Sequence, residues 1–167
     1  MYGDPENHDL KQALAAHHGV TPAHIAVGPG IDGLLGLVCR LTLETGTPVV
    51  TSLGAYPTFN FHVAGYGGVL TRVPYKGDHE DPESLVSAAK STGARLMYFA
   101  NPDNPMGSHH PASVVEAMVA NLPDHTLLIL DEAYADLAPE GTVPTIAADH
   151  PQVIRMRTFS KGYGLAG

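Results

Sequence analysis

The chain has 167 residues, of which 44% are hydrophobic and 16% are charged, and its formal net charge is −8. This length and composition predict a single globular unit with a real hydrophobic core and exclude a disordered chain. The negative charge, with no cluster of basic residues, argues against a nucleic-acid partner and against binding to a membrane surface.

The apolar pattern predicts helices and strands that alternate along most of the chain. Most of the expected strands are continuous apolar runs, which is typical of a mainly parallel sheet covered by helices on both faces. We therefore expect an α/β fold of three αβα layers, in which ligands bind beyond the carboxyl ends of the strands. The helices are expected at 9–18, 31–43, 56–65, 81–92 and 111–121, and the strands at 25–27, 48–52, 69–73, 95–100, 126–130 and 153–157.

The cysteine and histidine content and the hydropathy of the chain bear on its compartment and on metal binding. The single Cys39 cannot form an internal disulfide, and we find neither a signal peptide nor an apolar run long enough to span a membrane. These features lead us to expect a reducing compartment, namely the cytoplasm. The ten histidines occur as His17-His18, His109-His110 and single residues without metal-ligand spacing, so we expect no metal site.

A glycine-rich turn, Gly28-Pro29-Gly30-Ile31-Asp32-Gly33, joins an expected strand to an expected helix. Its spacing matches the dinucleotide fingerprint, but the next strand ends in Val50-Thr51-Ser52 and lacks the acidic residue that holds a ribose. The free N–H groups at a helix start suit a single phosphate better than a pyrophosphate. A glycine turn that serves only for packing is the alternative.

Asp131 ends an apolar strand, so its carboxylate is expected in a dry environment. A carboxylate in such a place needs a cationic partner or becomes protonated. The protonated pyridine nitrogen of pyridoxal 5′-phosphate (PLP) is one such partner. An aspartate that caps a loop or a helix is the alternative.

Three further side chains could contact the same cofactor. Tyr134 follows Asp131 by three residues and Asn104 lies between two prolines, so either could bind a ring oxygen. Tyr56, at a strand-to-helix junction, could stack on a planar ring. The alternatives are core packing for the tyrosines and an Asx-type backbone bond for Asn104.

Lys161 lies just beyond the last expected strand, in Thr158-Phe159-Ser160-Lys161-Gly162. A lysine that is partly desolvated at a strand end can act as an amine nucleophile in Schiff-base chemistry. A solvated surface lysine is the alternative. Together with the residues above, Lys161 completes a set that one cofactor could use: a phosphate cradle, a stacking ring, polar partners and a nucleophile.

The motifs 101–107, 131–134 and 158–167 together resemble fold-type I PLP-dependent aminotransferases of class I/II. Within this group the chain is most similar to the histidinol-phosphate aminotransferase branch. The resemblance covers nearly the whole chain. It implies that residues 1–167 form part of the PLP-binding large domain, and that the small C-terminal domain lies outside this chain.

The resemblance also implies a role for each candidate residue. Lys161 would form the Schiff base with PLP and move a proton during the reaction, while Asp131 would keep the pyridine nitrogen protonated. Tyr2 matches a tyrosine that the family lends to the neighbouring subunit's phosphate site, which implies a homodimer. The remaining implied contacts are Tyr134 and Asn104 at the phenolic oxygen, Tyr56 on the ring, and Thr158, Ser160 and the backbone of Gly30, Ile31 and Asp32 at the phosphate.

The chain departs from the usual family pattern at four positions. The family usually has a small hydroxyl residue or alanine at Ile31, an acidic residue at Gly33, threonine at Met106 and a larger residue at Gly162. The implied function is transamination between an amino acid or amino-alcohol phosphate and a 2-oxo acid. A PLP-dependent decarboxylase, lyase or oxidase remains an alternative, as does a truncated PLP-binding fragment without activity.

Overall fold

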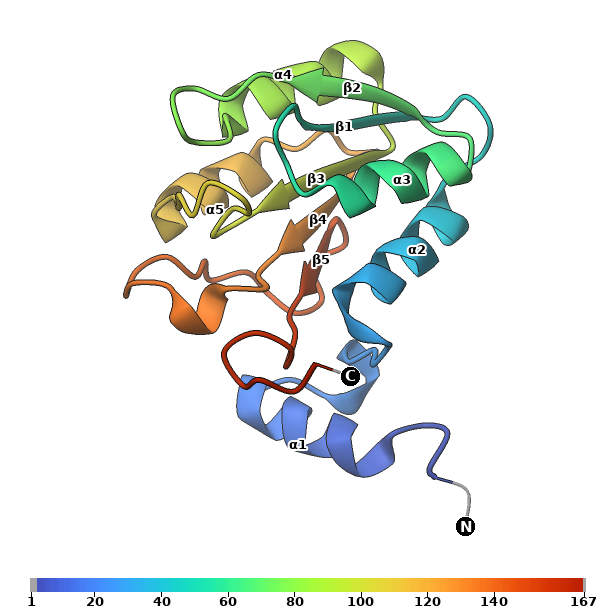
Figure 1. The fold of residues 1–167 in the computed structure, drawn as a ribbon, viewed down its shortest axis with the longest axis vertical. Coiled ribbons are helices and arrows are strands. Elements are labelled where there is room, and N and C mark those ends of the chain that lie inside the picture. Colours follow the sequence, from blue (N-terminus) through green and yellow to red (C-terminus); the bar gives the residue numbers. More distant parts are fainter. Residues whose placement is uncertain (1–2, 167) are drawn as a thin grey trace.

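The computed structural model describes residues 3–166 and shows a five-stranded sheet with helices on both faces (Figure 1). The strands are β1 (Pro48–Ser52), β2 (Val69–Val73), β3 (Leu96–Ala100), β4 (Leu127–Asp131) and β5 (Val153–Met156). The α-helices are α1 (His8–His18), α2 (Gly30–Thr42), α3 (Pro57–Gly65), α4 (Pro82–Thr92) and α5 (Ala112–Ala120). Two short 3₁₀ helices, η1 (Pro22–His24) and η2 (Ala135–Leu137), complete the described elements.

The strands are all parallel and lie in the order β2-β1-β3-β4-β5. The β3–β4 ladder runs through five residue pairs and ends at Ala100↔Asp131, whereas β1 and β3 pair only at Val49↔Leu96 and Val50↔Met97. The two central strands therefore separate before they reach their carboxyl ends. This separation is the point where strand addition changes direction, and in open α/β sheets that is the usual place for a ligand.

Each face of the sheet has its own hydrophobic core, because side chains along a strand alternate between the two faces. Leu35 and Cys39 of α2 and Phe59 of α3 pack on one face. Leu85 of α4 and Val115 of α5 pack on the other. The predicted three-layer α/β architecture is confirmed, and Figure 1 shows α2 and α3 together on one side of the sheet.

Most of the expected elements agree with the structure to within one or two residues. The strand expected at 25–27 is wrong: η1 precedes this segment, and the Ile25 N–H donates to the Pro22 carbonyl at 3.1 Å as the 3₁₀ turn ends. None of the described strands lies beside residues 25–27 to pair with them, so their apolar side chains alone do not make a strand. Within residues 3–166, no helix has both the length and the apolar character needed to cross a membrane.

Candidate active site

The carboxyl edge of the sheet brings together residues that are far apart in the sequence. Asp131 is the last residue of β4, Asn104 follows β3, Tyr56 follows β1, and Lys161 follows β5. Because the strands are parallel, their carboxyl ends meet at one edge. The topology therefore places four of the predicted residues on the same side of the molecule.

Asp131 is buried, with 6% of its surface exposed. The Tyr98 hydroxyl donates to Asp131 Oδ2 at 2.7 Å, and the Ala133 N–H donates to Oδ1 at 2.9 Å. Burial raises the pKa of Asp131, although these two hydrogen bonds and the charge of Lys161 act in the opposite direction. The ion pairs among the described residues do not include Asp131. Its carboxylate is thus held by neutral donors in a place that favours an additional cation.

Tyr134, Asn104 and Lys161 lie close to one another. The Asn104 side-chain amide donates to the Tyr134 hydroxyl at 3.3 Å. The Lys161 Nζ lies 5.6 Å from the centroid of the Tyr134 ring, within the range of a cation–π interaction. Asn104 is therefore hydrogen-bonded to another candidate residue, a contact that the sequence did not predict.

Tyr56 lies at the start of α3 and is 36% exposed. It lines an open hollow of about 510 Å³ together with Asn104. The hollow lies between the segments that follow β1 and β3, where the two strands have separated. Its other lining residues are Leu53, Gly54, Ala55, Pro57, Asn60, Arg72 and Pro105.

Thr158 and Ser160 form a small hydroxyl cluster after β5. Their Oγ atoms lie 2.8 Å apart, and the Ser160 N–H donates to Thr158 Oγ1 at 3.1 Å. The two hydroxyl groups therefore lie side by side in the segment that leads to Lys161. Such a cluster can donate hydrogen bonds to an anion.

The glycine turn leads directly into α2. Gly30 has a φ of 73°, which favours glycine, and its N–H donates to the Gly28 carbonyl at 2.8 Å. No side chain caps the helix start, so the N–H groups of Ile31 and Asp32 are not taken by a side-chain cap. The Asp32 carboxylate lies 2.9 Å from His62 Nε2 on α3, so this side chain is used for packing α2 against α3. Gly33 is needed for packing, since a Cβ there would lie 2.6 Å from Pro29 Cγ.

No hydrogen bond between described residues joins this turn to Thr158 or Ser160. The structure therefore contains two separate groups of donors, the glycine turn and the hydroxyl cluster. Ile31 belongs to the first group, as the second residue of α2. Tyr2, the residue expected to serve a neighbouring subunit, lies outside the described residues.

Tyr98 is a site residue that the sequence did not reveal. It is fully buried in β3, where its ring stacks on Phe59 of α3 at 4.9 Å between centroids. Its hydroxyl reaches the Asp131 carboxylate across the ladder. The sequence held one indication of this role, a tyrosine inside an otherwise apolar strand. A buried tyrosine O–H needs a hydrogen-bond partner, and here that partner is Asp131.

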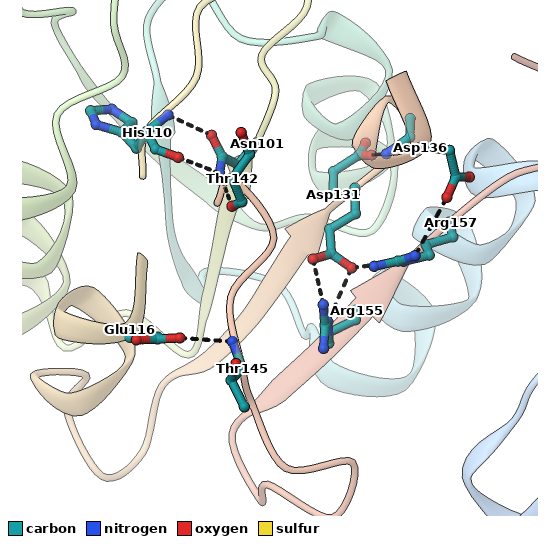
Figure 2. Close-up of polar contacts among 11 residues, drawn as sticks. Asn101, His110, Glu116, Asp131, Asp136, Thr142, Thr145, Arg155 and Arg157 are labelled. Atoms are coloured by element: carbon teal, nitrogen blue, oxygen red, sulfur yellow. Dashed lines mark hydrogen bonds and ion pairs between the residues drawn. The ribbon is translucent and has the colours of Figure 1, made fainter. Parts of the chain in front are cut away.

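Glu132, next to Asp131, forms a second missed group. Its buried carboxylate accepts hydrogen bonds from Arg155 at 2.7 and 3.0 Å and from Arg157 at 3.1 Å. Arg157 also lies 3.7 Å from Asp136. Figure 2 shows both guanidinium groups converging beside Asp131. Both arginines are therefore already paired with carboxylates. This includes Arg157, although it immediately precedes Thr158 of the candidate phosphate site.

Metal binding gains no support from the described residues, among which no group of three or more His, Cys, Asp or Glu side chains is arranged to hold an ion.

The family model of the class I and II aminotransferases matches residues 1–167. A histidinol-phosphate aminotransferase from Lactiplantibacillus plantarum is 34% identical over 99% of this chain and 47% of its own length. An aromatic amino acid aminotransferase from Thermobifida fusca is 33% identical over 99% of this chain and 46% of its own length. The chain thus spans about half the length of the curated relatives that it matches.

A crystal structure of histidinol-phosphate aminotransferase from Sinorhizobium meliloti in complex with pyridoxal-5′-phosphate has the same fold. It is 62% identical, its TM-score is 0.97, and the match covers all of this chain and 46% of the other. The fold is therefore that of the large domain of PLP-dependent transferases, as the motifs at 101–107, 131–134 and 158–167 predicted. The chain belongs to the class I and II aminotransferase family.

Proposed function

We propose that the protein to which this chain belongs catalyses PLP-dependent transamination between an amino acid or amino-alcohol phosphate and a 2-oxo acid. One observation carries the proposal: Asp131 is buried at the end of β4 with neutral donors only, on the same edge as Lys161. The named relatives, which are histidinol-phosphate and aromatic amino acid aminotransferases, favour transamination over the decarboxylase, lyase or oxidase alternatives.

The described residues fit PLP. The pKa of Asp131 is raised by burial, so a protonated ring nitrogen beside it would replace the solvation that the carboxylate has lost. Bound PLP supplies an electron sink that stabilises negative charge at the substrate Cα. By staying ionised, Asp131 would hold the proton on the ring nitrogen and so maintain that sink.

The other candidate residues would hold the cofactor in place. Tyr134 and Asn104, already hydrogen-bonded to each other, would donate to its phenolic oxygen, and Tyr56 would cover one face of its ring. The phosphate would bind the hydroxyls of Thr158 and Ser160 and the backbone N–H groups of Ile31 and Asp32. The Gly30 N–H would join them only by giving up its hydrogen bond to the Gly28 carbonyl.

Lys161 would attach to the cofactor through Nζ, and in the reaction its free amine would carry a proton to and from the substrate. Lys161 is exposed, and its Nζ lies 5.6 Å from the centroid of the Tyr134 ring, so the amine neighbours a residue proposed to hold the cofactor.

We further propose that residues 1–167 form part of a PLP-binding large domain and that the protein acts as a cytoplasmic homodimer. Tyr2 would then serve the phosphate site of the neighbouring subunit. The similarity of the chain to one half of each longer relative supports the domain assignment.

The test uses the full-length protein loaded with PLP. We expect visible absorbance from the bound cofactor, which changes when an amino donor is added and returns when a 2-oxo acid follows. Lys161→Ala should abolish covalent attachment and lower the rate of transamination by more than about a thousandfold. A wild-type protein without cofactor absorbance, or a Lys161→Ala protein with unchanged activity, would contradict the proposal.

A further inference from the structure

Glu80 is a buried carboxyl group that the proposed reaction does not use. It lies in the connection between β2 and α4, and 2% of its surface is exposed. The Ser52 hydroxyl at the end of β1 donates to Glu80 Oε2 at 2.5 Å. The Ala100 N–H at the end of β3 donates to Oε1 at 3.0 Å. One side chain thus bridges the ends of two strands.

The bridge lies where the sheet lacks its own hydrogen bonds. The β1–β3 ladder stops at Val50↔Met97, so the Ala100 N–H has no partner on β1 and takes Glu80 instead. Nearby, the fully buried Thr51 Oγ1 has no hydrogen-bond partner among the described residues. Because buried backbone donors are costly to leave unpaired, Glu80 is what makes the separation of these strands tolerable.

The two strand ends that Glu80 joins lead straight into the candidate site. Ser52 precedes the segment 53–57, which contains Tyr56, and Ala100 precedes the turn that contains Asn104. Both segments line the same hollow. The distance between the strand ends therefore sets the width of that hollow.

A second contact fixes the backbone of Glu80 itself. The His110 Nε2 atom lies 2.8 Å from the Glu80 carbonyl oxygen, and the His110 N–H donates to Asn101 Oδ1 at 2.8 Å. The segment around Glu80 is thereby attached to the first residue after β3 by a route that does not involve its carboxyl group. This attachment limits how far the carboxyl group can move from the two strand ends.

We propose that Glu80 is a positioning residue of the active site, whose carboxyl group ties the segment bearing Tyr56 to the turn bearing Asn104. The inference rests on the proposed function, since it concerns how the PLP site is held. Glu80 touches neither cofactor nor substrate in this role; it acts through the two strand ends.

The surroundings of the bridge favour its neutral form. The described groups near the Glu80 carboxyl are Asp103, Asp131 and the phenols of Tyr75 and Tyr98, and none of the described ion pairs includes Glu80. Burial raises the pKa of Glu80 to about 8. A glutamine can make the same two contacts, with its oxygen toward Ala100 and its NH₂ toward Ser52.

The experiment compares variants of the full-length protein with PLP and an amino donor. Glu80→Leu removes both acceptors at similar volume, Glu80→Gln keeps the bridge, and Glu83→Leu on the exposed first turn of α4 is the matched control. For Glu80→Leu we expect a rise of about tenfold in the Kd of PLP and a fall in kcat/KM on the order of a hundredfold. Glu80→Gln should restore both values to within about twofold, and the control should leave them unchanged.

The outcomes separate positioning from a merely structural role. A folded Glu80→Leu protein with unchanged PLP affinity and kcat/KM, or a Glu80→Gln protein that does not restore them, would overturn the inference. Should Glu80→Leu fail to fold, Ser52→Ala removes the β1 half of the bridge, and unchanged PLP affinity in that variant would also overturn it. A wild-type protein that binds no PLP overturns the proposed function. If the wild type binds PLP and every variant binds it equally well, only the role of Glu80 is overturned.

Discussion

Two buried glutamates lie at the carboxyl edge of the sheet, and the protein stabilises them by different means. Glu132, beside β4, is surrounded by the guanidinium groups of Arg155 and Arg157. Glu80, between β1 and β3, has only a hydroxyl and a backbone N–H as partners. Both are at most 2% exposed, so the contrast arises from their partners and not from their burial.

The contrast shows how one edge can contain a fixed part and a proton-dependent part. On the β4–β5 side, positive and negative groups are permanently matched, and the segment leading to Lys161 starts from this network. On the β1–β3 side the carboxyl group has no cation among the described residues, so a bound proton takes that place. We expect substitutions on the first side to act at every pH and those on the second side to act according to pH.

The largest effect is expected from Glu132→Ala, which leaves two arginines facing each other without their shared anion. Breaking such a buried pair from one side should lower the free energy of unfolding by about 4 kcal/mol. Urea denaturation at pH 7 measures the change, with Glu83→Ala at an exposed position as the control. A loss no larger than that of the control would show that the network contributes nothing to stability.

A smaller effect, limited to part of the pH range, is expected from Glu80→Gln. The folded protein retains the Glu80 proton up to about pH 8, whereas the unfolded chain releases it near the ordinary value of 4.5. The stabilisation is therefore complete below pH 4.5 and is lost as the pH rises to about 8. Glutamine has no such proton, so its advantage over the wild type should grow to a few kcal/mol across this range.

Denaturant unfolding of both proteins at a series of pH values provides the measurement. Parallel stability curves for the wild type and Glu80→Gln would contradict the expected difference, because they would mean that Glu80 titrates alike in the folded and unfolded states.

The smallest effect is expected from Tyr98→Phe. Tyr98 lies on β3 and its hydroxyl donates to Asp131 at the end of β4, so it connects the β1–β3 side with the β4–β5 side. The ring can keep its stacking on Phe59, but Asp131 loses the hydroxyl that donates to it. We expect a loss of about 1 kcal/mol in stability and a further rise in the pKa of Asp131. Urea denaturation and an NMR titration of the Asp131 carboxyl carbon test both changes. An unaltered titration would show that the Tyr98 hydroxyl does not stabilise the charged form.

The local pattern predicted the sheet well because each strand is an apolar run between turn residues. The segment 25–27 shows the limit of that pattern: it has the composition of a strand but none of the described strands beside it. Their positions after the strands also predicted that Asp131 and Lys161 lie at one edge of the sheet. The proposed roles of these residues in binding a cofactor remain predictions.

The partners of the buried groups could not be found in the same way. Glu80 meets Ser52 across 28 positions of sequence and Ala100 across 20, and Tyr98 meets Asp131 across 33. These contacts depend on which strands separate and by how much. That geometry arises from the packing of the whole sheet, and no local spacing of residues encodes it.

The short ladder between β1 and β3 has a consequence for how the chain folds. β1–β2 and β3–β4–β5 are each joined through at least four residue pairs, whereas two pairs connect these halves. Each half has more hydrogen-bonded pairs within itself than across the seam, so we expect the seam to form last and to open first, although both hydrophobic cores extend across it. In native-state hydrogen exchange, we expect the Ala100 amide at this seam to exchange before the amides inside the β3–β4 ladder.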